Sequence, residues 1–102
     1  MRLTNIYTWT PNDAEAVYKR FEAFGKGDAP KEVKDAFANL KIIAWEKLAS
    51  NTVVQVIEGD EVTLHTWIAY WDDLGESTAT PSWDLTNKQL LDALTPPSFM
   101  GQ

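Results

Sequence analysis

The hydrophobic positions of the chain follow a helical period in two long stretches. Apolar side chains recur three or four positions apart between residues 14 and 24 and again between residues 64 and 74. This spacing places them on one face of a helix, so both stretches are predicted to be amphipathic helices. Their apolar positions are Ala14, Val17, Phe21 and Phe24, then Leu64, Trp67, Ile68, Trp71 and Leu74. A shorter stretch with the same period follows Pro30 and predicts a further turn or two of helix.

Four other segments have the composition of β-strands. Residues 3–9 are rich in β-branched and aromatic types, and residues 41–49 and 52–58 are separated by a short turn that predicts a hairpin. Residues 77–83 can form a fourth strand. Proline has no amide hydrogen to donate to a neighbouring strand. Pro81 therefore predicts either that this strand lies at the edge of the sheet or that the strand ends at Pro81.

Capping residues predict where the helices begin. Asn12 is the expected N-cap of the first helix, and Asp60 is the expected N-cap of the helix that contains the tryptophans. Thr86 and Gln89 have the spacing of a capping box, which predicts a short terminal helix. The residues after it, 96–102, are expected to form a loose tail.

The order of these elements predicts the fold class. Strand, helix, hairpin, helix and strand is the β-α-β-β-α-β order of the ferredoxin-like α+β fold, here with an extra C-terminal helix. A chain of 102 residues forms one domain, which we assign to residues 1–95. In this fold the helices cover one face of an antiparallel sheet and leave the other face open.

The sizes of the side chains predict which strand residues lie under the helices. Large helix side chains such as Trp67 pack best against small strand residues, which assigns a set of small residues to the helix side. That set is Thr4, Ile6, Thr8, Ile42, Ala44, Val54 and Val56. The open face then carries Asn5, Tyr7, Trp9, Trp45 and Gln55, because successive strand residues point to opposite faces. Three aromatic rings on an open face are costly to leave in water, so a homodimer with facing sheets is expected.

The same five residues are the candidate ligand-binding residues. Asn5, Gln55 and Tyr7 offer polar groups beside Trp9 and Trp45, a mixture typical of small-molecule pockets. One hypothesis is therefore a homodimer that binds a small apolar or aromatic molecule between its sheets. The alternative is a non-catalytic accessory or interaction protein whose dimer interface is fully packed.

Composition and charge narrow the possible partners. A net charge of −6 without any basic run argues against nucleic acid. No apolar run has the roughly 20 residues needed to cross a bilayer, which predicts a cytoplasmic protein without a membrane partner. The absence of cysteine excludes disulfides and thiolate chemistry. No cofactor is expected.

The chain offers few groups for catalysis. His65, the single histidine, is predicted to lie on the solvent side of its helix, because it precedes Trp67 by two positions. Asp72 and Asp73 are neighbours and do not share a helix face. No phosphate-binding glycine loop, zinc-binding helix motif or nucleophile elbow is present, so no catalytic residue is assigned.

Several short motifs resemble an uncharacterised bacterial family within the dimeric α/β-barrel superfamily. They are the segment "YTWT" at residues 7–10, Arg20-Phe21, Trp45, Glu58, the Trp67 and Trp71 pair, and the region from Pro81 to Asp84. This resemblance covers residue 3 to about residue 94. It implies a ferredoxin-like fold and a dimer, and it supplies no activity. Glu46 and Ser50-Asn51 stand where members of the family often have a histidine and hairpin glycines.

Overall fold

The computed structural model describes residues 1–94, which form four strands and four α-helices. A single 3₁₀ turn, Pro11–Asp13, leads into the first helix. The strands are β1 (Arg2–Thr8), β2 (Lys41–Leu48), β3 (Thr52–Glu58) and β4 (Glu76–Pro81), and the helices are α1 (Ala14–Gly25), α2 (Lys31–Asn39), α3 (Glu61–Trp71) and α4 (Lys88–Leu94). Both the predicted order of elements and the α+β class are confirmed.

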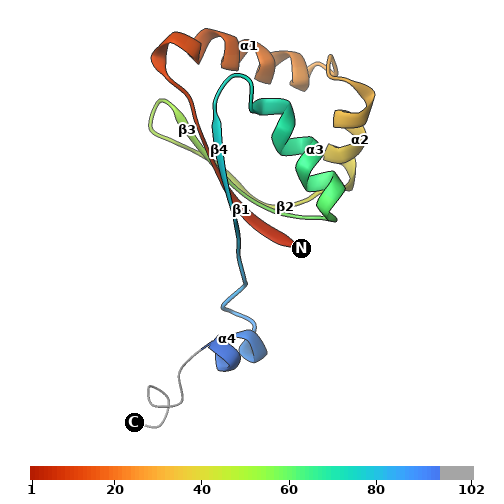
Figure 1. Ribbon diagram of the computed structural model, residues 1–102, viewed down its shortest axis with the longest axis vertical. Coiled ribbons are helices and arrows are strands. Elements are labelled where there is room, and N and C mark those ends of the chain that lie inside the picture. The colour runs from red at the N-terminus through yellow and green to blue at the C-terminus, as the bar shows by residue number, and fades with distance from the viewer. Residues whose placement is uncertain (95–102) are drawn as a thin grey trace.

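The four strands form one antiparallel sheet in the order β2-β3-β1-β4. Helices α1, α2 and α3 lie on one side of this sheet, whereas α4 stands away from it at the end of an extended segment (Figure 1). β4 is an edge strand and Pro81 is its last residue, as predicted. This topology is that of the ferredoxin-like α+β fold.

The helix starts are partly those predicted. Asp60 caps α3, because its side chain accepts a hydrogen bond of 2.7 Å from the backbone amide of Thr63. Asn12 lies inside the 3₁₀ turn and is not the N-cap of α1. At α4 the amide of Gln89 bonds to the side chain of Asn87 at 3.0 Å, so the predicted cap at Thr86 was one residue too early. The predicted tail, residues 96–102, lies outside the described residues.

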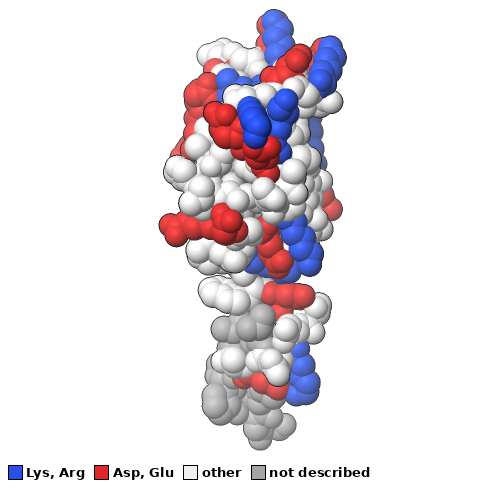
Figure 2. Space-filling model, turned by 90° about the vertical axis from the view of Figure 1, so that its right-hand side faces the viewer, with Lys and Arg blue, Asp and Glu red and all other residues white. Residues whose placement is uncertain are grey.

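Charged side chains of both signs alternate over the surface. On the face shown in Figure 2, blue and red groups are interspersed and no continuous basic area appears. Several of them are neighbouring pairs within one helix, such as Lys26 with Glu22 and Lys31 with Asp35. Exposed pairs of this kind contribute little to stability and serve mainly solubility.

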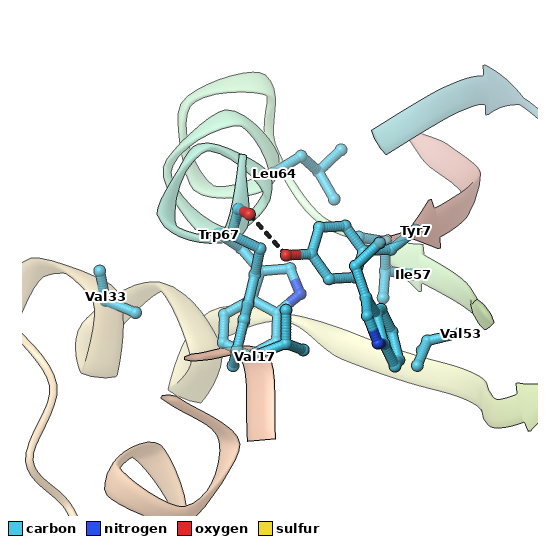
Figure 3. Close-up of a cluster of buried hydrophobic side chains, with 9 residues drawn as sticks. Tyr7, Val17, Val33, Val53, Ile57, Leu64 and Trp67 are labelled. Carbon is cyan, nitrogen blue, oxygen red and sulfur yellow. Dashed lines mark hydrogen bonds between the residues drawn. The ribbon is translucent and has the colours of Figure 1, made fainter. Parts of the chain in front are cut away.

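The core lies between the sheet and the three helices. Trp67 and Leu64 of α3, Ile57 of β3 and Val17 of α1 are its most deeply buried large side chains. Figure 3 shows α3 placing Leu64 and Trp67 over the strands, with the Tyr7 ring between them and the sheet residues. The stripe predicted for α3 is therefore the wall of the core.

The predicted assignment of the two sheet faces was wrong. Asn5, Tyr7, Trp9 and Gln55 are all buried on the helix side, and the Trp45 ring lies 6.4 Å from that of Phe21 in α1. The small residues predicted to face the helices lie on the open face instead, where Ile6 is 43% exposed. The exception is Ile42, which lies at a register shift in β2 and packs against the core. The predicted division of the strand residues into two faces was right, but the argument from side-chain volume assigned the wrong face to the helices. The two layers pack large rings against large rings, with the Trp45 ring of β2 5.9 Å from the Trp67 ring of α3.

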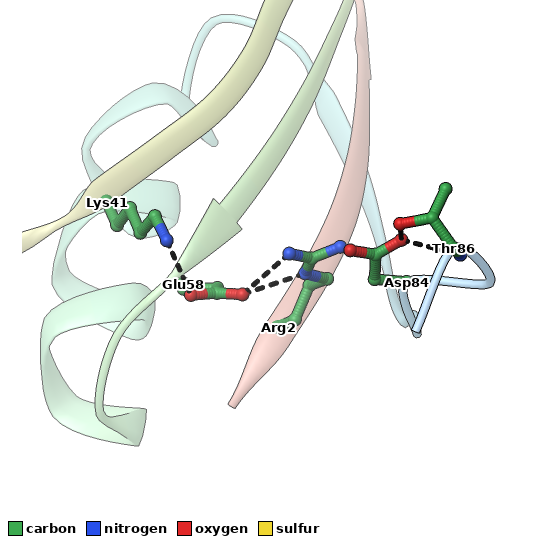
Figure 4. Close-up of polar contacts among 5 residues, drawn as sticks. All are labelled: Arg2, Lys41, Glu58, Asp84 and Thr86. Atoms are coloured by element: carbon green, nitrogen blue, oxygen red, sulfur yellow. Dashed lines mark hydrogen bonds and ion pairs between the residues drawn. The ribbon is translucent and has the colours of Figure 1, made fainter. Parts of the chain in front are cut away.

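Two arginines link neighbouring elements, one in the helix layer and one in the sheet. Arg20 of α1 holds the end of α3, because its guanidinium bonds both carboxylate oxygens of Asp73 and the backbone carbonyl of Tyr70. This ion pair keeps the pKa of Asp73 below its usual value. At the other end of the sheet, Arg2 pairs with Glu58 across β1 and β3 at 2.8 Å (Figure 4).

Candidate functional site

A small hollow lies between the middle of the sheet and the helices. We call it the inner hollow, and its volume of about 20 Å³ is enough for one water molecule. Its floor comes from the central strands and its walls from β2, α1 and α3. The lining residues are Asn5, Tyr7, Val53 and Gln55, then Phe21, Trp45, Trp67 and Trp71.

Two amide side chains form the polar floor of the inner hollow. Asn5 and Gln55 are directly opposite each other in the pairing of β1 with β3. Gln55 Oε1 accepts a hydrogen bond of 2.9 Å from Trp67 Nε1. Since an indole nitrogen can only donate, this contact fixes the orientation of the Gln55 amide and points its NH₂ group elsewhere.

Each amide keeps one buried atom without a partner. Asn5 Nδ2 donates to Ser77 Oγ at 3.4 Å, but Asn5 Oδ1 and Gln55 Nε2 make no hydrogen bond within the part of the chain that the structure describes. A buried polar atom left unpaired costs about 1–3 kcal/mol. The floor therefore presents one acceptor and one donor that need a complementary group.

Trp45 separates the inner hollow from the surface. Its ring lies 5.9 Å from Trp67 and 6.1 Å from Phe37, and the residue remains 38% exposed. On its outer side is a surface groove of about 340 Å³, which we call the outer groove. The groove is lined by Trp9, Tyr18, Phe21, Trp45, Glu46, Lys47 and Val53. Hollow and groove share Phe21, Trp45 and Val53, so a shift of the Trp45 ring would join them.

Tyr7 forms one side of the inner hollow as a hydrogen-bond donor. Its hydroxyl donates to the backbone carbonyl of Trp71 at 2.7 Å (Figure 3). Burial raises the pKa of Tyr7 to about 12. The side chain is therefore neutral at physiological pH, and it positions α3 over β1 rather than acting as a base.

The Tyr7 contact predicts a specific loss of stability in alkali. The unfolded chain ionises near the ordinary tyrosine pKa of about 10, whereas the folded chain resists ionisation until about 12. The stabilisation is complete below pH 10 and is lost as the pH rises through 12, by up to about 3 kcal/mol. We expect the free energy of unfolding, measured by urea titration from pH 9 to 12, to fall more steeply in the wild type than in Tyr7→Phe. Equal slopes in the two proteins would contradict this account.

Comparison with protein families gives one match. The model of a family described as a domain of unknown function, DUF3303, matches residues 1–92. The chain belongs to this family. Comparison with curated proteins and with solved structures finds no match.

All five candidate ligand-binding residues of this DUF3303 domain lie around one site. Asn5, Tyr7, Trp45 and Gln55 line the inner hollow, and Trp9 lines the outer groove beside Trp45. They are brought together on the helix side of the sheet, within a single chain, rather than on the open face.

The sequence interpretation missed four residues of the inner hollow, one of which is Val53 of β3. Phe21, Trp67 and Trp71 had been assigned to the core alone, yet each lines the inner hollow. Their helical spacing showed that they face the sheet. It could not show that a hollow remains beneath them.

Other groups of the DUF3303 domain take no part in this site. His65 is exposed on α3, as predicted, and Asp73 is held by Arg20. Among residues 1–94 no cluster of acidic or histidine side chains is arranged to hold a metal ion. None of the described helices has the length and apolar character needed to cross a bilayer.

Proposed function

We propose that this DUF3303 domain binds a small, largely apolar aromatic molecule between its sheet and its helices. The observation that supports this proposal is the pair of unpaired atoms, Asn5 Oδ1 and Gln55 Nε2, at the bottom of a hollow walled by aromatic rings. Apolar walls with a few converging polar groups are typical of small-molecule sites. The structural hydrogen bonds of these side chains, to Trp67 and Ser77, use their other polar atoms and leave these two atoms available to a ligand.

The two spaces suit different parts of one molecule. The outer groove, at about 340 Å³, has the size of a small ligand pocket and is largely aromatic. The inner hollow admits one atom of that molecule beside Asn5 and Gln55. In this arrangement the ring of the ligand stacks against Trp45 and Phe21 while its polar atom replaces the water of the hollow.

Tryptophan fluorescence tests the proposal directly. We expect saturable quenching by members of a library of small aromatic compounds, because Trp45 and Trp9 line the proposed site. Trp45→Ala should raise the dissociation constant obtained from this quenching at least about fivefold, since a stacked aromatic contact contributes about 1 kcal/mol beyond its buried area. Trp83→Ala is the matched control, because Trp83 is 59% exposed and lies outside both spaces.

The competing hypothesis is an accessory protein with a filled interior. In that case the inner hollow holds a structural water and nothing else. Quenching that never saturates, or that is unchanged in Trp45→Ala, would favour this second function over ligand binding.

We also propose that a second copy of the chain covers the open face of the sheet. On the central strands this face carries uncharged, mostly β-branched side chains, and the charged pair Arg2 and Glu58 stands at its end. The central members of this surface, the open sheet face, are Thr4, Ile6, Thr8, Val54 and Val56. An apolar centre with a polar rim is the usual composition of an interface.

The size of the open sheet face favours a self-complementary partner. Four strands of about six residues give this face on the order of 400 Å² per copy, about half of what each partner contributes to a standard interface. Exposed apolar side chains add area toward the roughly 1,200 Å² of a stable interface. They are Leu48, which pairs with Thr52 on this face, together with Trp83 and Leu85. Two facing sheets would form the dimeric α/β barrel that the superfamily resemblance implies. Light scattering at micromolar concentration should then give twice the 11.5 kDa of one chain.

A further inference from the structure

We infer that the molecule bound by this site carries a neutral hydroxyl group on an aromatic ring, as a phenol or an aromatic alcohol does, and that this hydroxyl lies between Asn5 and Gln55. The inference rests on the proposed ligand-binding function and specifies its substrate class. It follows from the size of the inner hollow, the types of atom at its floor and the charge of its lining.

The size of the inner hollow limits the polar group to a single heavy atom. About 20 Å³ accommodates one oxygen in the position of a water molecule. A carboxylate or a carboxamide brings three heavy atoms and does not fit beside the rings of Tyr7, Trp67 and Trp71. A hydroxyl attached to a ring in the outer groove fits once the Trp45 ring has shifted to join the two spaces.

The floor requires a group that both donates and accepts a hydrogen bond. Asn5 Oδ1 is an unpaired acceptor and therefore needs a donor, whereas Gln55 Nε2 is an unpaired donor and needs an acceptor. The orientation of Gln55 is fixed by the bond from Trp67 Nε1. An ether oxygen or a halogen cannot donate, and an ammonium group cannot accept. A hydroxyl does both, as the water in the same place would.

The lining favours the un-ionised hydroxyl. None of the residues that line the inner hollow is a lysine or an arginine. The neighbouring phenol of Tyr7 shows the preference of this environment, since burial raises its pKa to about 12. A phenolate would be desolvated there without a cation and could not donate to Asn5 Oδ1.

Three small aromatic probes test the inference on the wild-type protein: phenol, its isostere toluene, and the methyl ether anisole. We expect phenol to bind with a millimolar dissociation constant. Shifts of the indole N–H signals in ¹H–¹⁵N spectra measure this binding. The Trp67 signal should respond most, because its N–H bonds to Gln55. Phenol should bind at least about tenfold more tightly than toluene, since a site with buried partners for a hydroxyl rejects an analogue that lacks it. Anisole should bind no more tightly than toluene.

Two variants test the roles of the floor residues. Asn5→Leu and Gln55→Met should each bring the ratio of phenol to toluene affinity to about one, while toluene still binds. Thr4→Val is the matched control, because Thr4 neighbours Asn5 on β1 but belongs to the open sheet face. It should leave the ratio unchanged.

The possible outcomes separate this inference from the proposed function. If toluene binds saturably and phenol binds no more tightly, the hydroxyl inference is wrong and the aromatic site stands. If none of the three probes shifts the Trp45 or Trp67 signals, both proposals are wrong and the hollow holds only water. If a variant does not fold, the probe series on the wild type still decides.

Discussion

Replacing Gly75 with alanine is expected to lower the free energy of unfolding by at least about 3 kcal/mol, the upper part of the range for overpacked sites. Gly75 directly precedes β4 and lies against β1. A Cβ atom there would stand 2.6 Å from the backbone oxygen of Thr8 and 2.6 Å from Cζ of the Tyr7 ring. Real Cβ atoms do not approach other atoms so closely, so the strand or the ring has to move.

Neither neighbour can move at low cost. The Thr8 carbonyl belongs to a strand paired on both sides, and the Tyr7 ring is packed against Trp9 and bonded to the Trp71 carbonyl. Moving the ring breaks that hydrogen bond, which is the shorter of the two that the Trp71 carbonyl accepts. Urea titration at a fixed protein concentration, monitored by circular dichroism, measures the loss in the free energy of unfolding.

Gly25→Ala is the matched control for Gly75→Ala. Gly25 is the last residue of α1, and a Cβ atom there has no other atom within 4 Å. Alanine is also the better helix former, by up to about 1 kcal/mol. We expect Gly25→Ala to be neutral or stabilising. A loss below about 1 kcal/mol in Gly75→Ala would show that β4 shifts freely, and the described contact between β1 and β4 would then be wrong.

Ile6→Lys is expected to convert the proposed dimer into a monomer, with the dissociation constant raised at least about a hundredfold. Ile6 lies on the central strand β1, in the middle of the open sheet face, and is 43% exposed in the single chain. In a dimer with facing sheets the two-fold axis brings two lysines into an apolar interface without a counterion. Burying such charges costs several kcal/mol, which corresponds to a factor of a hundred or more.

The folded chain itself should tolerate Ile6→Lys, because the side chain points away from the core. Light scattering over a dilution series gives the dissociation constant, and circular dichroism checks the fold. Val62→Lys is the control, because Val62 is 75% exposed on α3, on the other side of the molecule. A dimer that persists in Ile6→Lys would show that the copies associate through another surface. A monomeric wild type would contradict the proposed dimer itself.

The local elements could be predicted because their determinants are local. Asp60 shows that α3 begins at residue 61, and Pro81 shows that β4 ends at the sheet edge. The errors at Asn12 and Thr86 have the same origin, since several residues at each start can cap and only the backbone path selects one. At α4 the residue selected was Asn87.

The side of the sheet that the helices cover could not be predicted in this way. The alternation of side chains along β1 places Asn5, Tyr7 and Trp9 on one face and Thr4 and Ile6 on the other. It does not determine which of the two faces the helices cover. The choice by volume assumed that large helix residues need small partners. In the structure large helix rings pack against large strand rings instead, as Trp67 does edge to face against Trp45 at 5.9 Å.

The amino-acid sequence by itself determined the elements of this domain, their order, its ferredoxin-like class and the set of five residues that share one sheet face. Periodicity, caps and turns carry that information, because each acts within a few residues. Only the tertiary structure decided that this face lies beneath the helices and that a hollow the size of one water remains above Asn5 and Gln55. The physical reason is that hydrogen bonds between distant residues, from Trp67 to Gln55 and from Tyr7 to Trp71, fix how the layers meet.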